Sequence, residues 1–366
     1  MKNETKKALE AAGWRFGDAS DFLEAINSHG KKIRNNKMNY LEIIKNVVNN
    51  GVAKQATRYD AAGNVIPVEN GTVGTFCEIF RHDMSAGFPL TTLRKMPWKS
   101  IRVELEGFIK GVTDKRWFQE RGCKFWDEWA NPKLVNQHKY VQEFKYDEAT
   151  PRKTLEAEWN NRKKEAQKEL TDLGPIYGYQ WVNFGKTYDY GQSFNDLCSD
   201  ETGLPDGFNQ FKSIVDKLKS SPYDRRMVCS AWNPNQMHMA ALPPCHWAWN
   251  IVVYGDKLNL IWHQRSCDLL LGVGANIASY GLLLMLLCKE SGLKPGELVG
   301  TLADCHIYEN HMEAAKKLIE REEKELPQIE ILDKDGKFSI FEWEWKDVLL
   351  TNYNPHDKID VGAVTV

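Results

Sequence analysis

The sequence lacks an excess of either charge. Its 366 residues include 48 Lys and Arg against 50 Asp and Glu, and the formal net charge is -2. A chain balanced in this way has no general attraction to nucleic acid or to an anionic membrane, so any phosphate-binding site must be local. Because 42% of the residues are hydrophobic, we expect a substantial packed core rather than disorder.

The patterns that mark export, disulfide scaffolds and membrane spans are also missing. The N-terminal residues have no apolar run and no cleavage pattern. The eight cysteines include no Cys-x-x-Cys pair, so free thiols are expected. The most apolar stretch, 269–288, is interrupted by Gly272, Gly274 and Gly281 and falls short of the roughly 20 apolar residues that a span requires. We therefore expect a cytoplasmic protein in which this stretch is a buried helix.

The signatures of doubly wound nucleotide-binding folds are absent as well. No Gly-x-Gly-x-x-Gly or P-loop pattern follows a predicted strand, and helices and strands do not alternate regularly. Local sequence patterns instead predict an amphipathic helix at 39–48, a solvated helix rich in Lys and Glu at 155–170, further helices at 98–110, 276–291 and 309–321, a strand at 75–80, and a hairpin at 247–264. This mixture indicates an α+β fold.

Cys245 immediately precedes the predicted hairpin. With the turn at Gly255-Asp256, strand pairing would place Cys245 opposite Ser266 and His246 opposite Arg265. Most free cysteines are buried and inert. A guanidinium beside the thiol, however, would lower its pKa and raise the thiolate fraction, which makes Cys245 a candidate nucleophile.

Short motifs occur along the chain in one characteristic order. They are Trp126-Asp127-Glu128-Trp129, Leu173-Gly174-Pro175-Ile176-Tyr177-Gly178, Asp224-Arg225-Arg226, Leu242-Pro243-Pro244-Cys245-His246, Gln264-Arg265-Ser266-Cys267-Asp268, Asn276-Ile277-Ala278-Ser279-Tyr280, His306-Ile307-Tyr308 and Asn310-His311. No single motif is specific, but the ordered set, spread over 39–366, resembles the thymidylate synthase family.

The resemblance implies one large α+β domain, in which a mixed, twisted sheet is covered by helices and dimerises through the sheet. It places this catalytic domain at 37–366, after an N-terminal extension at 1–36. The charged stretch at about 131–172 then forms a surface insertion. The implied activity is reductive methylation of dUMP to dTMP, with methylenetetrahydrofolate as co-substrate and without a metal.

For catalysis, the resemblance implies that the thiolate of Cys245 attacks C6 of uracil and thereby makes C5 nucleophilic. Glu104 would order water for proton transfer, together with Tyr177 and His246, and partial burial would raise the pKa of Glu104. Arg265 would lie beside the thiol and hold the phosphate.

For dUMP binding, the resemblance implies a set of polar side chains from both subunits of a homodimer. The set is Arg58, Arg225, Arg226, Gln264, Ser266, Asn276, His306 and Tyr308. Arg225 and Arg226 would reach the phosphate from the partner subunit, since guanidinium groups bind phosphate bidentately. Asn276 can both donate and accept, which suits O4 and N3 of uracil. Taken alone, an Arg pair is more often a surface feature, and an Asn before an apolar helix is usually its cap.

For the folate, the resemblance implies aromatic walls, a carboxylate for the pterin ring and a C-terminal lid. The residues are Trp126, Trp129, Leu242, Asp268, Gly272, Ala275 and Val366. In a chain with 13 tryptophans, any one of them is more often core than ligand wall.

The chain departs from the family pattern in three places. An inserted stretch separates Arg58 from the glycines and threonines at 71–75. Residues 273–275 read Val-Gly-Ala where the family usually has Leu-Pro-Phe, and the C-terminal tail at 362–366 lacks the usual proline. The smaller Ala275 and the altered tail could both admit water to the site.

Two alternatives to thymidylate synthesis therefore stay open. If water rather than hydride meets the methylene intermediate, the product is hydroxymethyl-dUMP, and the chain is a deoxyuridylate hydroxymethylase. A non-catalytic nucleotide- or RNA-binding relative is the other alternative, although the chain has no basic stripe with interleaved aromatics.

Overall fold

The structure is a computed structural model of the chain. It describes residues 39–55, 57–59, 65–67, 70–145, 147, 149–188, 207–333 and 336–360. The predicted extension at 1–36 and the predicted lid with Val366 lie outside the described residues. Arg58 lies in a described strand, but its side chain does not belong to the described part.

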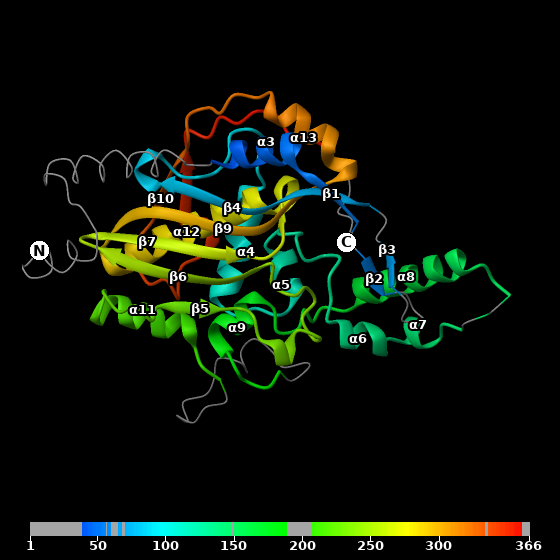
Figure 1. The fold of residues 1–366 in the computed structure, drawn as a ribbon. Helices are drawn as coiled ribbons and strands as arrows, with labels where there is room; N and C mark the ends of the chain where they lie inside the picture. The colour runs from blue at the N-terminus through cyan, green and yellow to red at the C-terminus, as the bar shows by residue number, and fades with distance from the viewer. Residues whose placement is uncertain are drawn as a thin grey trace, which may run out of the picture. The chain divides into compact units, whose positions relative to one another are not determined.

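A mixed, open sheet forms the centre of the fold (Figure 1). Its strands, in spatial order, are β1 (Val52–Lys54), β4 (Thr72–Asp83), β9 (Lys294–Tyr308), β7 (Lys257–Gln264), β6 (His246–Tyr254) and β5 (Val228–Ser230), and β8 (Cys267–Asp268) also pairs with β9. The pairs of β9 with β7 and with β8 are parallel and the others are antiparallel. Two-stranded sheets join β2 (Thr57–Tyr59) to β3 (Val65–Pro67) and β10 (Gln328–Ile331) to β11 (Val348–Thr351). The predicted α+β class is therefore correct.

Helices cover one face of this sheet. They include α4 (Trp98–Ile109), α9 (Tyr177–Asn183), α11 (Gln210–Ser220) and α12 (Gly274–Ser291), while α3 (Tyr40–Asn50) and α13 (Met312–Ile319) pack near β4 and β9. Along β7, alternate residues are buried, so Leu258, Leu260 and Trp262 face the helices. The core lies between this face and the helices.

Helix α12 is the most apolar element. Together with the π turn η3 (Leu269–Val273) before it, it spans 23 residues, and an 18-residue window within it has a mean hydropathy of 1.9, so the segment is long and apolar enough for a membrane span. However, 72% of its apolar window is buried inside the protein, and Gly292 ends it in a left-handed conformation with φ 74°. The prediction of a buried core helix is confirmed.

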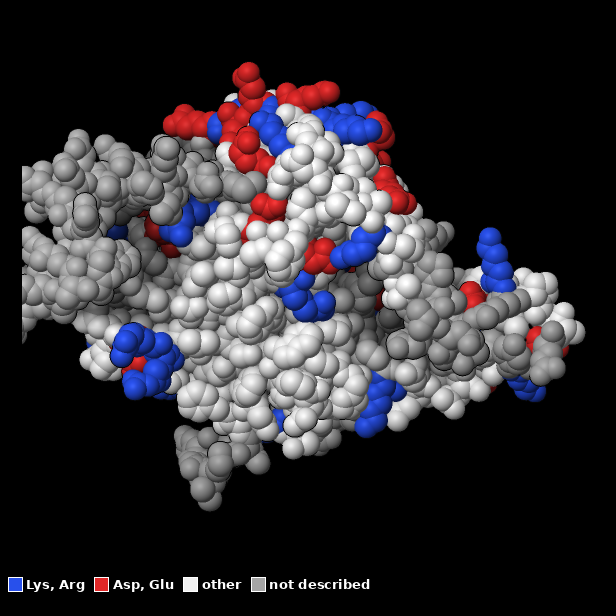
Figure 2. Space-filling view, in the orientation of Figure 1, with Lys and Arg blue, Asp and Glu red and all other residues white. Residues whose placement is uncertain are grey.

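Within the described residues, no helix crosses the centre of the opposite face of the sheet (Figure 1). Exposed apolar side chains there or at its border include Phe76, Ile79, Val228 and Trp247. The central surface in Figure 2 shows few charged side chains. An apolar surface of this kind is typical of an interface.

The charged stretch at 131–172 folds into three helices, α6 (Pro132–Gln137), α7 (Lys139–Gln142) and α8 (Arg152–Glu169). They share a small apolar cluster of Ala130, Val135, Val141 and Ala166, against which Trp159 and Leu170 pack. The two ends of the stretch meet, because the backbone N–H of Asn131 donates to Asp172 O over 2.8 Å. The stretch therefore leaves the main fold and returns to it at one place.

The hairpin of β6 and β7 turns at Gly255-Asp256, as predicted. Its pairing keeps one register until Ala248 faces His263. A β-bulge at Trp247 then shifts the register by one residue, which changes every pairing closer to Cys245.

Candidate active site

The bulge decides what lies opposite Cys245. The backbone N–H of Arg265 donates to Cys245 O over 2.9 Å, and His246 pairs with Gln264. The predicted pairings, Cys245 with Ser266 and His246 with Arg265, are wrong by one residue, because the bulge inserts an extra residue into β6. The predicted proximity of the Cys245 thiol to the Arg265 guanidinium is nevertheless confirmed.

The guanidinium of Arg265 is held against the segment that carries Cys245. Its Nε donates to Pro244 O over 3.0 Å and its Nη2 to Pro243 O over 2.9 Å. Its Cζ lies 5.4 Å from the centre of the Trp232 ring, which is a favourable position for a cation over an aromatic face. These contacts fix a positive charge beside the cysteine.

The thiol of Cys245 is half-buried. Burial raises its pKa above the ordinary value, while Arg265 and a hydrogen bond with Tyr177 act in the opposite direction. The expectation of a net lowering of the pKa of Cys245 is therefore wrong, because the loss of hydration outweighs the neighbouring cation. Arg265 itself acts to lower the pKa of Cys245, as expected.

Tyr177 and His246 lie beside Cys245, as predicted. The backbone N–H of Cys245 donates to the Tyr177 hydroxyl over 2.8 Å, and the Tyr177 ring stacks on His246 with centroids 4.2 Å apart. Nδ1 of His246 lies 2.9 Å from the Tyr280 hydroxyl. Burial lowers the pKa of His246 to about 3, so its imidazole is neutral at physiological pH.

Glu104 belongs to the same region through Trp126. The indole Nε1 of Trp126 donates to Glu104 Oε1 over 3.0 Å, and the Trp126 ring lies edge-on to Tyr177. Burial raises the pKa of Glu104 to about 7, against the smaller opposing effect of the Trp126 hydrogen bond. A carboxyl group with this pKa can give and take a proton near neutral pH.

Asn276 and Gln264 form one hydrogen-bonded unit. The amide of Gln264 donates to Asn276 Oδ1 over 3.1 Å and to Ser266 O over 3.0 Å. Asn276 lies within α12, and Asp268 caps the preceding turn by accepting from Leu270 N and Leu271 N. The simple reading of Asn276 as a helix cap is therefore excluded.

The short strand β8 brings further predicted residues together. Asp268 pairs with His306 across β8 and β9, and the rings of His306 and Tyr308 meet edge to face at 5.4 Å. The pKa of Tyr308 is raised, first by burial and then by the charges of Asp268 and Cys245. Tyr308 thus lies within electrostatic range of the thiol.

The remaining predicted folate residues are partly exposed. Trp129, Leu242, Gly272 and Ala275 all keep part of their surface accessible, and a Cβ added at Gly272 would lie 3.7 Å from Asn276 Oδ1. Trp126 is the exception, because its side chain is 4% exposed and already donates to Glu104. In the described part of the chain, no three His, Cys, Asp or Glu side chains converge as metal ligands.

Arg225 and Arg226 do not reach Cys245 within one chain. Both are exposed, and Met227 next to them accepts a hydrogen bond from Ile251 N. Ile251 lies six residues along the strand from Cys245, so the separation is about 20 Å at roughly 3.3 Å per residue. The two arginines belong to a different part of the chain's surface.

The sequence alone assigned no role to Tyr280 or Trp232, although both contact predicted site residues. Tyr280 orients His246, and its signal was its position four residues after Asn276, on the same helix face. Trp232 lies under Arg265, and no local pattern in the sequence indicates that contact.

Comparisons with known proteins agree with this geometry. The sequence pattern of the thymidylate synthase family matches residues 38–365. Thymidylate synthase of Mycoplasma genitalium is 35% identical over 331 residues, which cover 89% of this chain and 99% of that protein. Thymidylate synthase of Homo sapiens is 35% identical over 323 residues, covering 88% and 89%. The bifunctional dihydrofolate reductase-thymidylate synthase of Zea mays is 33% identical over 328 residues, covering 90% of this chain and 54% of that protein. The chain belongs to the thymidylate synthase family.

Proposed function

We propose that this chain catalyses the reductive methylation of dUMP to dTMP, with methylenetetrahydrofolate as donor of both the carbon and the hydride. The observation that carries the proposal is the half-buried Cys245, with the fixed guanidinium of Arg265 and the hydroxyl of Tyr177 both beside it. Family membership and the names of the relatives support the same activity.

The proposed first step is addition of the Cys245 sulfur to C6 of the uracil ring, which leaves C5 as the carbon nucleophile. Arg265 and the hydrogen bond with Tyr177 both favour the thiolate and so act against the larger effect of burial, which raises the pKa of Cys245. The bond from sulfur to C6 breaks again when dTMP leaves, so the thiol is regenerated.

Uracil recognition is assigned to Asn276. Because Gln264 donates to its Oδ1, the amide is oriented and its NH₂ group is available to donate to O4 of uracil. One lone pair of Oδ1 stays available for N3–H. A cytosine would present a donor where this NH₂ group also donates, so dUMP is favoured over dCMP.

Proton transfer is assigned to Glu104, with Tyr177 and His246 beside it. A pKa of about 7 lets the Glu104 carboxyl exchange protons near neutral pH. His246 stays neutral, so its proposed role is to position Tyr177 by ring stacking. His306 and Tyr308 are assigned to the sugar hydroxyl, and Ser266 to the phosphate.

The folate is assigned to the partly exposed residues Trp129, Leu242, Gly272 and Ala275, with Asp268 at the pterin ring. Asp268 Oδ1 already caps the turn before α12, and a carboxylate has further acceptor capacity for a ring N–H. Trp126 is assigned to the wall behind Glu104, because its indole N–H is already used.

A homodimer through the face of the sheet opposite α4, α9, α11 and α12 completes the proposal. That face carries exposed apolar side chains, and Arg225 and Arg226 lie too far from Cys245 to act in their own chain. We propose that they bind the nucleotide phosphate in the partner's site, as guanidinium groups do.

Product identity tests the proposal most directly. Incubation with dUMP and methylenetetrahydrofolate should add a methyl group, identified by mass. A hydroxymethyl product would replace the proposal by the hydroxymethylase alternative, for which the small Ala275 offers a route for water. No adduct at C5 would reject both activities.

Cys245→Ser tests the nucleophile. Turnover should fall by at least about 1,000-fold, because a hydroxyl is a far poorer nucleophile than a thiolate, while dUMP binding is retained. Cys288→Ser is the matched control, since Cys288 lies twelve residues beyond Asn276 on α12, about 18 Å away. Undiminished biological activity of Cys245→Ser would favour the binding-only alternative.

A further inference from the structure

Lys115 is a fully buried lysine outside the residues assigned so far. It is the first residue of α5 (Lys115–Glu120), and its side chain is 1% exposed. A buried lysine is rare unless its charge is compensated, because removing an ammonium group from water is costly. Its position therefore calls for a specific set of partners.

The ammonium group of Lys115 has three donors and meets three backbone carbonyls. Nζ donates to Asp127 O over 3.1 Å, to Trp129 O over 3.3 Å and to Gln167 O over 2.5 Å. The number of donors equals the number of acceptors. An apolar side chain of the same length would leave all three carbonyls without this donor.

The three carbonyls come from two different elements. Gln167 lies in the last turn of α8, where carbonyls lack helical partners and the helix dipole favours a cation. Asp127 and Trp129 lie in the turn that carries Trp126, whose indole donates to Glu104. The lysine thus connects the charged insertion to a wall of the candidate site.

Backbone pairing already closes the base of the insertion, where Lys115 N donates to Thr171 O and Leu173 N to Thr113 O. The side chain of Lys115 reaches further, to Gln167 within α8. The contact with α8 is therefore an addition to the pairing at the base and can be removed separately.

We propose that Lys115 is a positioning residue, which ties the last turn of α8 to the turn at 126–129 and so sets the position of the proposed folate wall. The charged insertion then contributes to folate binding without touching the ligand. This inference rests on the proposed function, because the role of Trp129 in folate binding is itself part of that proposal.

Lys115→Met removes the three donors and keeps the length of the side chain. We expect faster hydrogen exchange both at 126–130 and at 163–170, a KM for methylenetetrahydrofolate raised about tenfold, and a KM for dUMP and a kcat within about twofold of wild type. Faster exchange confined to α5, or an unchanged KM for the folate, would overturn the proposal.

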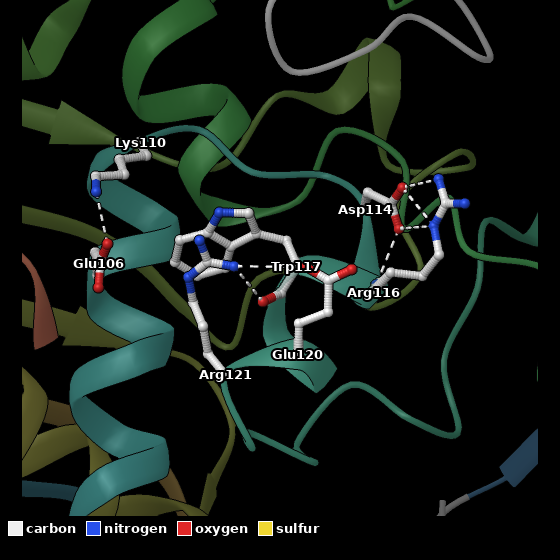
Figure 3. A network of polar contacts seen from close by, with 7 residues as sticks. All are labelled: Glu106, Lys110, Asp114, Arg116, Trp117, Glu120 and Arg121. Atoms are coloured by element: carbon white, nitrogen blue, oxygen red, sulfur yellow. Dashed lines mark hydrogen bonds and ion pairs between the residues drawn. The ribbon is translucent and has the colours of Figure 1, made fainter.

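Arg116→Met is the matched control. Arg116 is the next residue of the same helix and its substitution removes the same charge, but its guanidinium pairs with Asp114 at the surface (Figure 3). Exchange at 126–130 and 163–170 should stay at the wild-type rate. An equal loosening in this variant would show a general effect of charge and contradict the proposal.

A second measurement decides the question if Lys115→Met does not fold. In Cys245→Ser, which holds dUMP and methylenetetrahydrofolate without turnover, folate binding should slow exchange at 166–170, because coupling between two sites is reciprocal. If hydrogen exchange at 166–170 is unchanged when folate is bound, the proposed coupling between α8 and the turn at 126–129 is contradicted. Absence of folate binding would instead refute the proposed function and, with it, the role of Lys115 in folate binding.

Discussion

At the scale of single residues, Glu104 shows how burial changes the pKa of a carboxyl group. Its carboxyl accepts a hydrogen bond from Trp126, and this does not offset the loss of hydration, so its pKa rises from 4.5 to about 7. A raised pKa means that the folded chain binds this proton more tightly than the unfolded chain does. Stability and the proton transfer that we propose for Glu104 therefore involve the same ionisation.

We predict that Glu104→Gln removes an ionisation near pH 7 from the pH profile of kcat/KM and lowers its maximum. The stability from the protonated carboxyl is fully present below pH 4.5 and is lost as the pH rises through about 7. A neutral amide avoids this loss, so the variant should exceed wild type by roughly 3 kcal/mol in free energy of unfolding at pH 8 and match it at pH 4.

Urea unfolding at both pH values checks the stability part of this prediction. Glu128→Gln is the control, because Glu128 is exposed in the neighbouring turn and its substitution should leave both the pH profile and the stability unchanged. Equal stability of Glu104→Gln and wild type at pH 8 would contradict a pKa near 7.

At the scale of elements, the close approach of α4 and α9 positions Tyr177. A Cβ added at Gly178 would lie 2.6 Å from both Cα and the carbonyl O of Phe108. Only glycine permits this separation, since backbone atoms cannot move aside as a flexible side chain can. Tyr177, the first residue of α9, thereby reaches the backbone of Cys245.

We predict that Gly178→Ala lowers the free energy of unfolding by about 2 kcal/mol, because α9 must move away from α4. Tyr177 moves with α9, so kcat should fall as well. Thermal or urea unfolding measures the first effect. Gly272→Ala serves as the stability control, since its added Cβ meets nothing closer than 3.7 Å; equal losses in the two variants would argue against a special α4–α9 contact.

Polar contacts around α4 and α5 also hold neighbouring segments in position (Figure 3). Arg121 lies over the Trp117 ring at 3.9 Å and donates to Trp117 O, while Lys110 pairs with the buried carboxylate of Glu106. Glu106 also accepts from Trp345 N over 2.8 Å. Helix α4 therefore presents Glu104 to the candidate site and holds the C-terminal segment with Glu106.

At the scale of the whole molecule, the separation between Arg226 and Cys245 is the reason that we propose a site built from two chains. A phosphate beside Arg265 is out of reach of Arg226 in the same chain. In a symmetric dimer each face contributes to the other's site.

We predict that mixing two inactive variants restores activity. Cys245→Ser lacks the nucleophile, and a variant with Arg225→Ala and Arg226→Ala lacks the donated arginines. In a heterodimer the intact Cys245 meets intact arginines, so random exchange should restore about one quarter of the wild-type sites. Specific activity after mixing measures the recovery.

The control for this prediction mixes Cys245→Ser with Arg265→Ala. Both residues belong to the same half of the site, because the backbone of Arg265 pairs with that of Cys245, so no hybrid site is complete. Recovery in this control, or its absence in the first mixture, would contradict the donation of arginines across the interface.

The sequence by itself determined the features that depend on local interactions. The amphipathic helix at 39–48, the buried helix after residue 276 and the turn at Gly255-Asp256 all appear in the structure. Each follows from periodicity or turn chemistry over a few residues. The ordered motifs around Cys245 were equally visible, because they are contiguous in the chain.

Only the tertiary structure decided which groups face one another. The bulge at Trp247 moved Arg265 opposite Cys245, burial reversed the expected net shift in the pKa of Cys245, and Lys115 joined carbonyls from elements up to 52 residues away. Register, hydration and long-range contacts arise from packing of the complete chain, and no short stretch of sequence contains them.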